Sequence, residues 1–181
     1  MPSSLTFWKW VMIFTVGVLT GLWFGLPDSQ ERNFDNQTRY HKEAQWIARA
    51  VYSESKTFSN YEYIAWTIRN RMASERYPDN ARSVVLQQDQ FSAFRNPEKR
   101  EKLLKMKYPE TKNTYFRRAY RIALYVLNSD RSVNPMPEVT HFYMEDTMKR
   151  AYGVERPSWA EGRDPYFANG QTKYFRNIQA P

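Results

Sequence analysis

The residue best placed for chemistry is a carboxylate, Glu54, in the stretch IARAVYSESKT at residues 47–57. It follows Val51 by three positions and Ile47 by seven, so it continues the apolar stripe of a predicted amphipathic helix to the point where that helix should end. Burial against apolar side chains and the negative end of the helix dipole both disfavour a charged carboxyl group. The pattern therefore indicates either an acid that holds its proton for catalysis or a helix-end charge that pairs locally, for example with Arg49.

Other familiar catalytic and metal-binding patterns do not occur in the sequence. The 181 residues include no cysteine, which excludes disulfides, thiolate metal sites and cysteine nucleophiles. The two histidines, His41 and His141, have no metal-binding spacing, and there is no nucleophile elbow, phosphate-binding loop or dinucleotide-binding glycine motif. A serine triad is not excluded, although no motif marks one. Acid–base chemistry by carboxylates, without a metal or cofactor, is what the residue types favour.

The elements that must position Glu54 are mostly helical. Apolar spacing predicts helices at about residues 42–53, 61–72, 96–107 and 113–128, with one or two helical turns and a loop at 81–94. After Pro137 the sequence becomes β-branched and aromatic, which favours short strands at residues 139–144 and 172–178. The predicted fold class is α+β, a mainly helical domain with a small antiparallel sheet.

The N-terminal end of the chain has a different character. Residues 5–26, LTFWKWVMIFTVGVLTGLWFGL, carry one charge, Lys9, and are long enough to cross a hydrocarbon core of about 30 Å. Tryptophans near both ends are typical of a membrane interface. A cleaved signal peptide is the alternative, but no small-x-small cleavage site follows the run. We expect a membrane anchor at residues 1–27, a polar linker at 28–41 and the folded domain at 42–181.

A repeat of glycines marks one face of the predicted anchor. Gly17, Gly21 and Gly25 recur every four residues and therefore line one side of a helix. Small residues at this spacing let two membrane helices approach closely, which favours a homodimer through this face. The alternative is that glycine is simply common in membrane spans.

The net charge of +8 favours anionic partners such as nucleic acid, an acidic lipid surface or a cell-wall polymer. Most of the excess positive charge lies between Arg95 and Arg121, a segment that contains ten lysines or arginines and three glutamates. Aromatic residues interleave these charges, as in grooves that bind single-stranded nucleic acid. However, Phe116 and Tyr120 fall on a predicted apolar stripe, which favours a solvated helical pair with its aromatic rings in the core. Nucleic acid is therefore the less favoured partner, behind an anionic wall or membrane.

Five short motifs occur in order along the soluble part. The first contains Ala-Val-Tyr-x-Glu, here ending at Glu54, and an Asn-Arg pair that ends at Arg71. The others are YPDNARSVV with QFS, then VTHFY, PSWA and ANGQTKYFRN. Together, over about residues 42–177, they resemble the SleB-type cell-wall hydrolases, the spore-cortex-lytic family. The sequence departs from the family pattern where a closing histidine is replaced by Lys173 or Thr172, and in a longer, more basic stretch at 95–111.

The resemblance implies a compact, lysozyme-like domain that cleaves peptidoglycan glycan strands, with Glu54 as the catalytic acid. In such a reaction Glu54 donates its proton to the oxygen between muramic acid and glucosamine, through an oxocarbenium-like transition state. Without a second carboxylate, Glu54 can take the proton of the sugar's own 6-hydroxyl, which closes a 1,6-anhydro ring and makes the enzyme a lytic transglycosylase. If Asp79 or Asp89 lies opposite, simple hydrolysis can occur instead.

The residues expected to line the cleft are Tyr52, Gln90, Ser92, His141, Tyr143 and Trp159. His141 and Tyr143 alternate along a predicted strand, so both point to one face. Tyr143 and Trp159 are suited to packing against sugar rings, with core packing as the alternative for Trp159 and a structural role as the alternative for His141. Asn70 and Arg71 are interpreted as structural residues that brace the end of a helix.

The expectation from the sequence is a single-pass, membrane-anchored peptidoglycan glycosidase without a cofactor. Its anchor would lie in the inner (cytoplasmic) membrane and its catalytic domain in the periplasm or at the cell exterior. One alternative is a wall-binding or assembly protein that keeps the fold but has no activity. Another is a membrane-tethered nucleic-acid-binding protein that uses residues 95–121. An amidase is less favoured because neither a metal-ligand set nor a clear nucleophile is present.

Overall fold

The structure is a computed structural model that describes residues 29–88, 90–176 and 178. The predicted membrane span, its glycine face and Asp89 lie outside these residues, so the expectations about them stay predictions. Within the described ranges, every helix is too short or too polar to span a bilayer. The chain divides into two compact units, residues 1–39 and 40–181.

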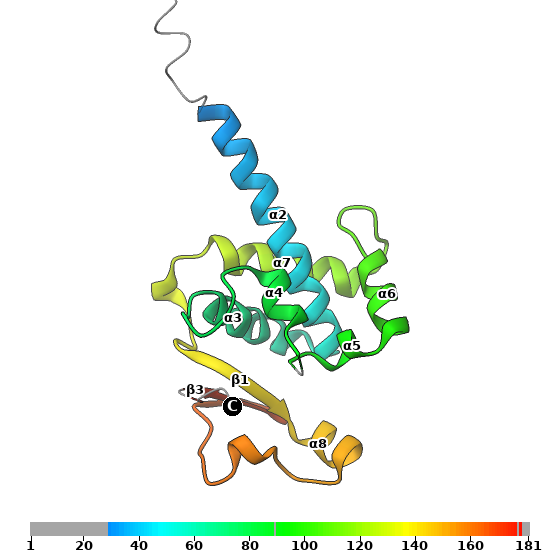
Figure 1. Ribbon diagram of the computed structural model, residues 1–181, viewed down its shortest axis with the longest axis vertical. Helices are drawn as coiled ribbons and strands as arrows, with labels where there is room; N and C mark the ends of the chain where they lie inside the picture. Colours follow the sequence, from blue (N-terminus) through cyan, green and yellow to red (C-terminus); the bar gives the residue numbers. More distant parts are fainter. Residues whose placement is uncertain (1–28, 89, 177, 179–181) are drawn as a thin grey trace, which may run out of the picture. The chain divides into compact units, whose positions relative to one another are not determined.

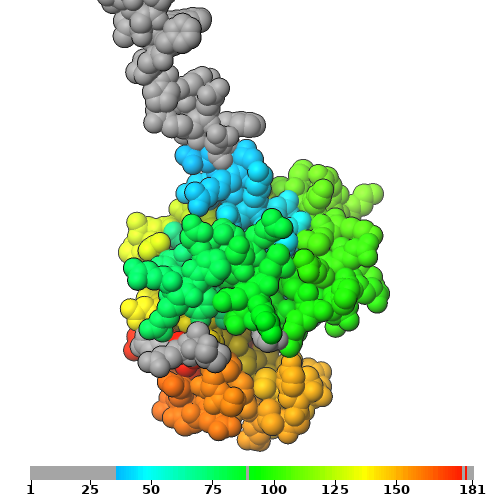
Figure 2. All heavy atoms as spheres, in the orientation of Figure 1, coloured from blue at the N-terminus to red at the C-terminus, as the bar shows by residue number. Residues whose placement is uncertain are grey.

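The architecture is a helical layer followed by a small sheet, which confirms the α+β prediction. The helices and strands are α2 (Ser29–Glu54), α3 (Tyr61–Met72), α4 (Ala81–Leu86), α5 (Ser92–Arg95), α6 (Pro97–Lys105), α7 (Thr114–Asn128), β1 (Val139–Met144), α8 (Glu145–Tyr152), β2 (Phe167–Asn169) and β3 (Thr172–Arg176). Helices α3 to α7 lie on one side of the sheet, and the segment between β1 and β2, which includes α8, lies on the other (Figure 1). Figure 2 shows the same division, with the helical segment in green and the segment after β1 in orange.

Helix α2 begins much earlier than the sequence indicates. The segment predicted to be a polar linker, residues 28–41, is helical from Ser29 onward. This part of the helix has no apolar stripe, and hydrophobic periodicity was the signal on which the prediction depended. In the first unit, residues 29–39 are the described part, and they are helical throughout.

The core of the second unit is built from the predicted stripes. Ala44, Ile47, Ala48 and Val51 of α2 and Tyr61, Ile64, Ala65 and Ile68 of α3 are fully buried. The inward face of α7 packs into the same cluster, including Phe116 and Tyr120. The Asn113 side chain caps α7 by accepting a hydrogen bond from the Phe116 N–H (2.9 Å), and Asn96 caps α6 in the same way. The expected helix starts at 96 and 113 are therefore confirmed.

The sheet has the strand order β1-β3-β2, with both pairs antiparallel. One face, which includes Phe142 and Tyr174, packs on the helical core. The other face carries His141, Tyr143 and Phe175 and is covered by the segment around Trp159. The sequence predicted β1 and β3 but neither β2 nor α8. Strand β2 has three residues and α8 has eight, so both are shorter than the window of about 11 residues in which a periodic pattern is recognised.

Candidate active site

Glu54 is the last residue of α2, as its place on the apolar stripe predicted. The backbone N–H of the next residue, Ser55, still donates to the Val51 carbonyl (3.2 Å), so the helix keeps its geometry up to this point. The Oε1 atom of Glu54 is buried and finds no hydrogen-bond partner within the described part of the chain. A buried carboxyl oxygen without a partner is costly, and such groups in native proteins are frequently functional.

Burial raises the pKa of Glu54 to about 7. Hydrogen bonding by the Ser92 backbone and the positive charges of Arg71 and Arg95 act in the opposite direction and lower it. Desolvation therefore outweighs two cations and a backbone donor. A carboxyl group with this pKa can both give and take a proton near neutral pH, which general acid–base catalysis requires.

Arg71, near the end of α3, is buried beside this carboxyl group. Its Nε donates to the Thr140 carbonyl (2.6 Å) on β1. Its guanidinium carbon lies 5.5 Å from the centre of the Tyr77 ring and 5.6 Å from that of Phe91. Its Nη1 is buried and has no hydrogen-bond partner among the described residues. Glu54 and Arg71 thus each have one polar atom without a hydrogen-bond partner among the described residues, and the two side chains lie close together. A site that binds polar groups has this character.

His141 belongs to the same cluster, because the charge of Arg71 acts on its ring. Burial, and then the charge of Arg71, lower the pKa of His141 to about 4, so its ring is neutral at neutral pH. Its Nδ1 pairs with the Thr140 hydroxyl (3.0 Å). A neutral imidazole with so low a pKa is a weak base, which favours a hydrogen-bonding or packing role for His141 over acid–base chemistry.

Arg49, the local partner considered for Glu54, makes other contacts. Its Nε donates to the Leu103 carbonyl (3.1 Å) and one Nη to the Met106 carbonyl (3.2 Å). Its guanidinium also lies over the Trp46 ring, 4.9 Å from the ring centre. Arg49 therefore holds the end of α6 against α2, and the alternative of a local ion pair with Glu54 is not realised.

Three of the predicted cleft residues gather on one face of the sheet. The ring centre of Trp159 lies 5.1 Å from that of His141 and 5.9 Å from that of Tyr143. His141 and Tyr143 do point to the same face of β1, and Tyr143 also stacks on Phe175. Tyr143 is buried, whereas Trp159 is half-buried and keeps part of its indole ring accessible.

Tyr52 lies against a different element. Its hydroxyl accepts a hydrogen bond from Asn113 Nδ2 (3.2 Å), and its ring packs edge-on against Phe116 of α7. Residues two apart on a helix do not face the same side. The structure therefore places Tyr52 in contact with α7, whereas Glu54 faces Ser92 and Arg71.

The segment from Gln90 to Ser92 approaches Glu54 through its backbone. Ser92 is the first residue of α5 and is exposed, and its backbone makes a hydrogen bond to the Glu54 carboxyl group. Phe91, fully buried beside Arg71, anchors the segment. Gln90 is half-buried and its backbone N–H bonds to the Gln87 carbonyl (3.3 Å).

The two positions considered for the family's closing histidine lie on opposite faces of β3. Lys173 pairs with Tyr143 across the sheet, so it shares the face of His141, and its Nζ lies 3.7 Å from a carboxylate oxygen of Glu145. Thr172 is buried on the other face, where its hydroxyl accepts a hydrogen bond from Asn60 Nδ2 (3.1 Å). The position that shares the His141 face is therefore Lys173.

The sequence predicted a structural role for both Asn70 and Arg71, but not that Arg71 lies beside Glu54. Asn70 Nδ2 donates to the carbonyls of Met136 (2.8 Å) and Val139 (2.9 Å), which confirms its structural role. Arg71 also braces β1, but it faces Glu54 as well. A signal for this was present, because Arg71 continues the apolar stripe of α3, just as Glu54 continues that of α2.

Comparison with known proteins gives the family. A family model described as Cell Wall Hydrolase matches residues 55–175, more than half of the chain. The chain belongs to this family. The match confirms the resemblance to SleB-type enzymes and supports a peptidoglycan hydrolase. The matched range begins one residue after Glu54 and does not include it. No curated protein and no solved structure matches the chain.

Proposed function

We propose that this cell-wall hydrolase cleaves the bond between N-acetylmuramic acid and N-acetylglucosamine in peptidoglycan, with Glu54 first as acid and then as base. The observation that carries the proposal is the buried Glu54 carboxyl, whose Oε1 lacks a partner among the described residues and whose pKa is raised to about 7. At neutral pH such a group holds a proton in a large fraction of molecules and can deliver it to a glycosidic oxygen.

The reaction begins with transfer of the Glu54 proton to the bridging oxygen. The bond from that oxygen to C1 of the muramic acid breaks, and positive charge develops on C1 and the ring oxygen. The 6-hydroxyl of the same sugar then attacks C1, and its proton passes to the Glu54 carboxylate. This step closes a 1,6-anhydro ring and restores the acid. The charge of Arg71 stabilises the Glu54 carboxylate while the proton is absent.

We favour transglycosylation over hydrolysis because of the charges around Glu54. Among described residues, the charged groups that act on its pKa are the cations Arg71 and Arg95. Asp79 is exposed, and its carboxylate accepts a hydrogen bond from Asn80 Nδ2 (3.2 Å). Activation of a water by Asp89, which lies outside the described residues, is the hydrolytic alternative.

Product analysis distinguishes the two reactions. Full-length protein in detergent is incubated with purified peptidoglycan, and the soluble fragments are examined by mass spectrometry. Transglycosylation predicts 1,6-anhydromuramic ends, which borohydride cannot reduce. Hydrolysis would yield reducible ends, heavier by one water. Reducible ends alone would overturn the single-carboxylate mechanism, although not the glycan bond as the target.

We also propose that residues 5–26 anchor the enzyme in the cytoplasmic membrane, with residues 42–181 in the periplasm or at the cell exterior. The support is the length and composition of this stretch in the sequence. An anchored protein stays in the membrane fraction after alkaline carbonate extraction, and added protease digests its catalytic domain from the outer side. Cross-linking of wild type but not of Gly21→Leu would support a dimer through Gly17, Gly21 and Gly25.

A further inference from the structure

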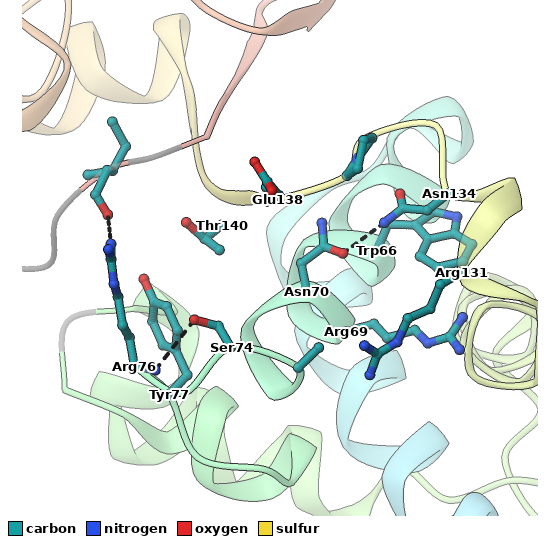
Figure 3. A pocket seen from close by; sticks show the side chains of 13 residues that line it. Trp66, Arg69, Asn70, Ser74, Arg76, Tyr77, Arg131, Asn134, Glu138 and Thr140 are labelled. Carbon is teal, nitrogen blue, oxygen red and sulfur yellow. Dashed lines mark hydrogen bonds between the residues drawn. The ribbon is translucent and has the colours of Figure 1, made fainter.

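A pocket of about 450 Å³ is lined in part by residues that contact Arg71, and no step of the proposed reaction uses it. Its walls come from the second half of α3, the loop that follows, and the segment that leads into β1. Figure 3 shows the guanidinium groups of Arg69 and Arg131 near each other at one end of the pocket and Arg76 at the other. Glu138 and Thr140 lie between them.

The pocket and the Glu54 site are joined through the contacts of Arg71. Tyr77 lines the pocket, and its ring centre lies 5.5 Å from the Arg71 guanidinium carbon. Thr140 also lines the pocket, and its carbonyl accepts the hydrogen bond from Arg71 Nε (2.6 Å). The pocket is therefore separated from the Glu54 carboxyl by one side chain, that of Arg71.

The charge of the pocket suits an anion. Its lining includes three arginines and one glutamate. Burial, and then the nearby charge of Arg131, lower the pKa of Arg69, while Tyr40 and Asp130 act in the opposite direction. Two cations held near each other repel, and an anion bound between them would relieve that repulsion. Arg69 is fixed in place, because it donates to the Val126 carbonyl and lies over the Trp66 ring at 4.9 Å.

Glu138 adds a negative group to this mainly positive pocket. Its backbone is in the left-handed region, with φ at 63°, which residues other than glycine rarely adopt. Such strain persists only where the surrounding structure enforces it, and it clusters at functional positions. Nearby, Asn134 Nδ2 donates to Asn70 Oδ1 (2.8 Å), which ties the preceding loop to α3. The pocket therefore offers several guanidinium groups and one carboxylate to a ligand.

We propose that this pocket binds the peptide stem that branches from muramic acid. A stem peptide carries several carboxylates and, on its diamino acid, a free amine. The carboxylates would pair with Arg76 and Arg131, because a guanidinium group matches a carboxylate in a two-bond geometry, and the amine would pair with Glu138. The proposal rests on the proposed function, since only a glycan strand cleaved at Glu54 brings a stem beside the pocket.

Direct binding tests the pocket without cleavage. The probe is the tripeptide L-alanyl-γ-D-glutamyl-diaminopimelic acid, titrated calorimetrically into full-length protein in detergent. The variant replaces two exposed arginines, Arg76→Gln with Arg131→Gln, and the control replaces two exposed arginines elsewhere, Arg100→Gln with Arg163→Gln. We expect at least tenfold weaker binding by the pocket variant and unchanged binding by the control. Equal affinity of both variants, or no binding by wild type at millimolar peptide, would overturn the proposal. Tighter binding of glycerol phosphate than of the peptide would overturn the carboxylate assignment.

Cleavage kinetics separate failure of the pocket from failure of the proposed function. The substrates are glycan strands with intact stems and strands stripped of stems by an amidase. We expect the pocket variant to show a KM raised about tenfold on stem-bearing strands, with kcat unchanged and no change on stripped strands. The same KM increase on both substrates would contradict a role in stem binding. Absence of glycan cleavage by wild type on either substrate would refute the proposed function, and the peptide titration would then decide the pocket by itself.

Discussion

At the scale of residues, the balance around Glu54 decides its chemistry. Two arginines and a backbone donor favour the carboxylate, yet burial outweighs them and raises the pKa to about 7. If burial were weaker, Glu54 would ionise well below neutral pH and hold no proton to donate. If the arginines were absent, the carboxylate left after donation would lack stabilisation. The opposed effects keep both protonation states accessible.

A raised pKa also predicts how Glu54 affects stability. The folded state holds the Glu54 proton more tightly than the unfolded chain, so folding loses stability as pH rises from the ordinary carboxyl pKa, 4.5, to about 7. Glu54→Gln removes this loss. We expect the variant to be more stable than wild type at pH 8, by up to about 3 kcal/mol, and so to melt at a higher temperature, with little difference at pH 4. Thermal melts across this range measure it, and a pH-independent difference would contradict the raised pKa.

In the proposed mechanism Arg71 acts on the reaction through Glu54, so a pH profile of kcat/KM can test its role. Its charge lowers the pKa of Glu54, and removal of that charge should raise this pKa further. We expect Arg71→Gln to shift the alkaline limb of kcat/KM to higher pH and to lower its maximum at least tenfold. Arg82→Gln, an exposed control on α4, should change neither. A uniform loss of rate with an unshifted profile would indicate that Arg71 only supports the fold.

At the scale of elements, the site is the meeting point of two helix ends, a short helix and a strand. Glu54 ends α2, Arg71 lies in the last turn of α3, Ser92 opens α5, and His141 lies on β1. The apolar stripes predicted α2, α3, α7 and β1 because these elements bury a regular face. The stripes could not show that Glu54 and Arg71, the charged residues that continue them, lie close together. That proximity depends on how α3 packs against β1 and on how Phe91 is anchored.

The faces of these elements predict different effects for two aromatic residues. Tyr52 contacts α7, and Trp159 covers the His141 face of the sheet with part of its ring accessible. We expect Tyr52→Phe to leave kcat/KM within about twofold of wild type and to cost about 1 kcal/mol of stability, from the lost hydrogen bond to Asn113. Trp159→Ala should raise KM several-fold. Kinetics on soluble glycan strands and thermal melts measure these effects. A large loss of kcat/KM in Tyr52→Phe with an unchanged KM in Trp159→Ala would place Tyr52, and not Trp159, in the cleft.

Three of the four aromatic residues that interleave the basic charges of residues 95–121 pack in or against the core. Phe116 and Tyr120, two of the interleaved aromatics, are buried, and the half-buried Tyr108 stacks on Tyr120 at 4.3 Å between ring centres. Rings in such positions cannot stack on bases. The fourth ring, Tyr115, is 48% exposed and stacks on Phe58 at 5.0 Å between ring centres, so the preference for an anionic wall or membrane over nucleic acid stays a prediction.

At the scale of the whole molecule, the sequence predicted the order of the main helices, the strands β1 and β3 and the place of Glu54 at the end of α2, but not the shape of the site. The polar part of α2 has no apolar stripe, and strand β2 and helix α8 are too short for their periodicity to be recognised. The pocket lined by Arg69, Arg76 and Arg131 draws on segments far apart in the chain. Such a juxtaposition has no local sequence signature, whereas a single carboxylate on a buried stripe does.

The central claim is that Glu54 is the acid of a glycan-cleaving enzyme, and the rate of peptidoglycan cleavage by Glu54→Gln tests it most directly. The control is Glu98→Gln, whose carboxylate is exposed on α6 and pairs with Lys102. Full-length variants are compared at pH 6.5 by release of soluble muropeptides. The account predicts a loss of at least about 10³-fold for Glu54→Gln and an unchanged rate for Glu98→Gln. A folded Glu54→Gln protein that cleaves at the wild-type rate would contradict it.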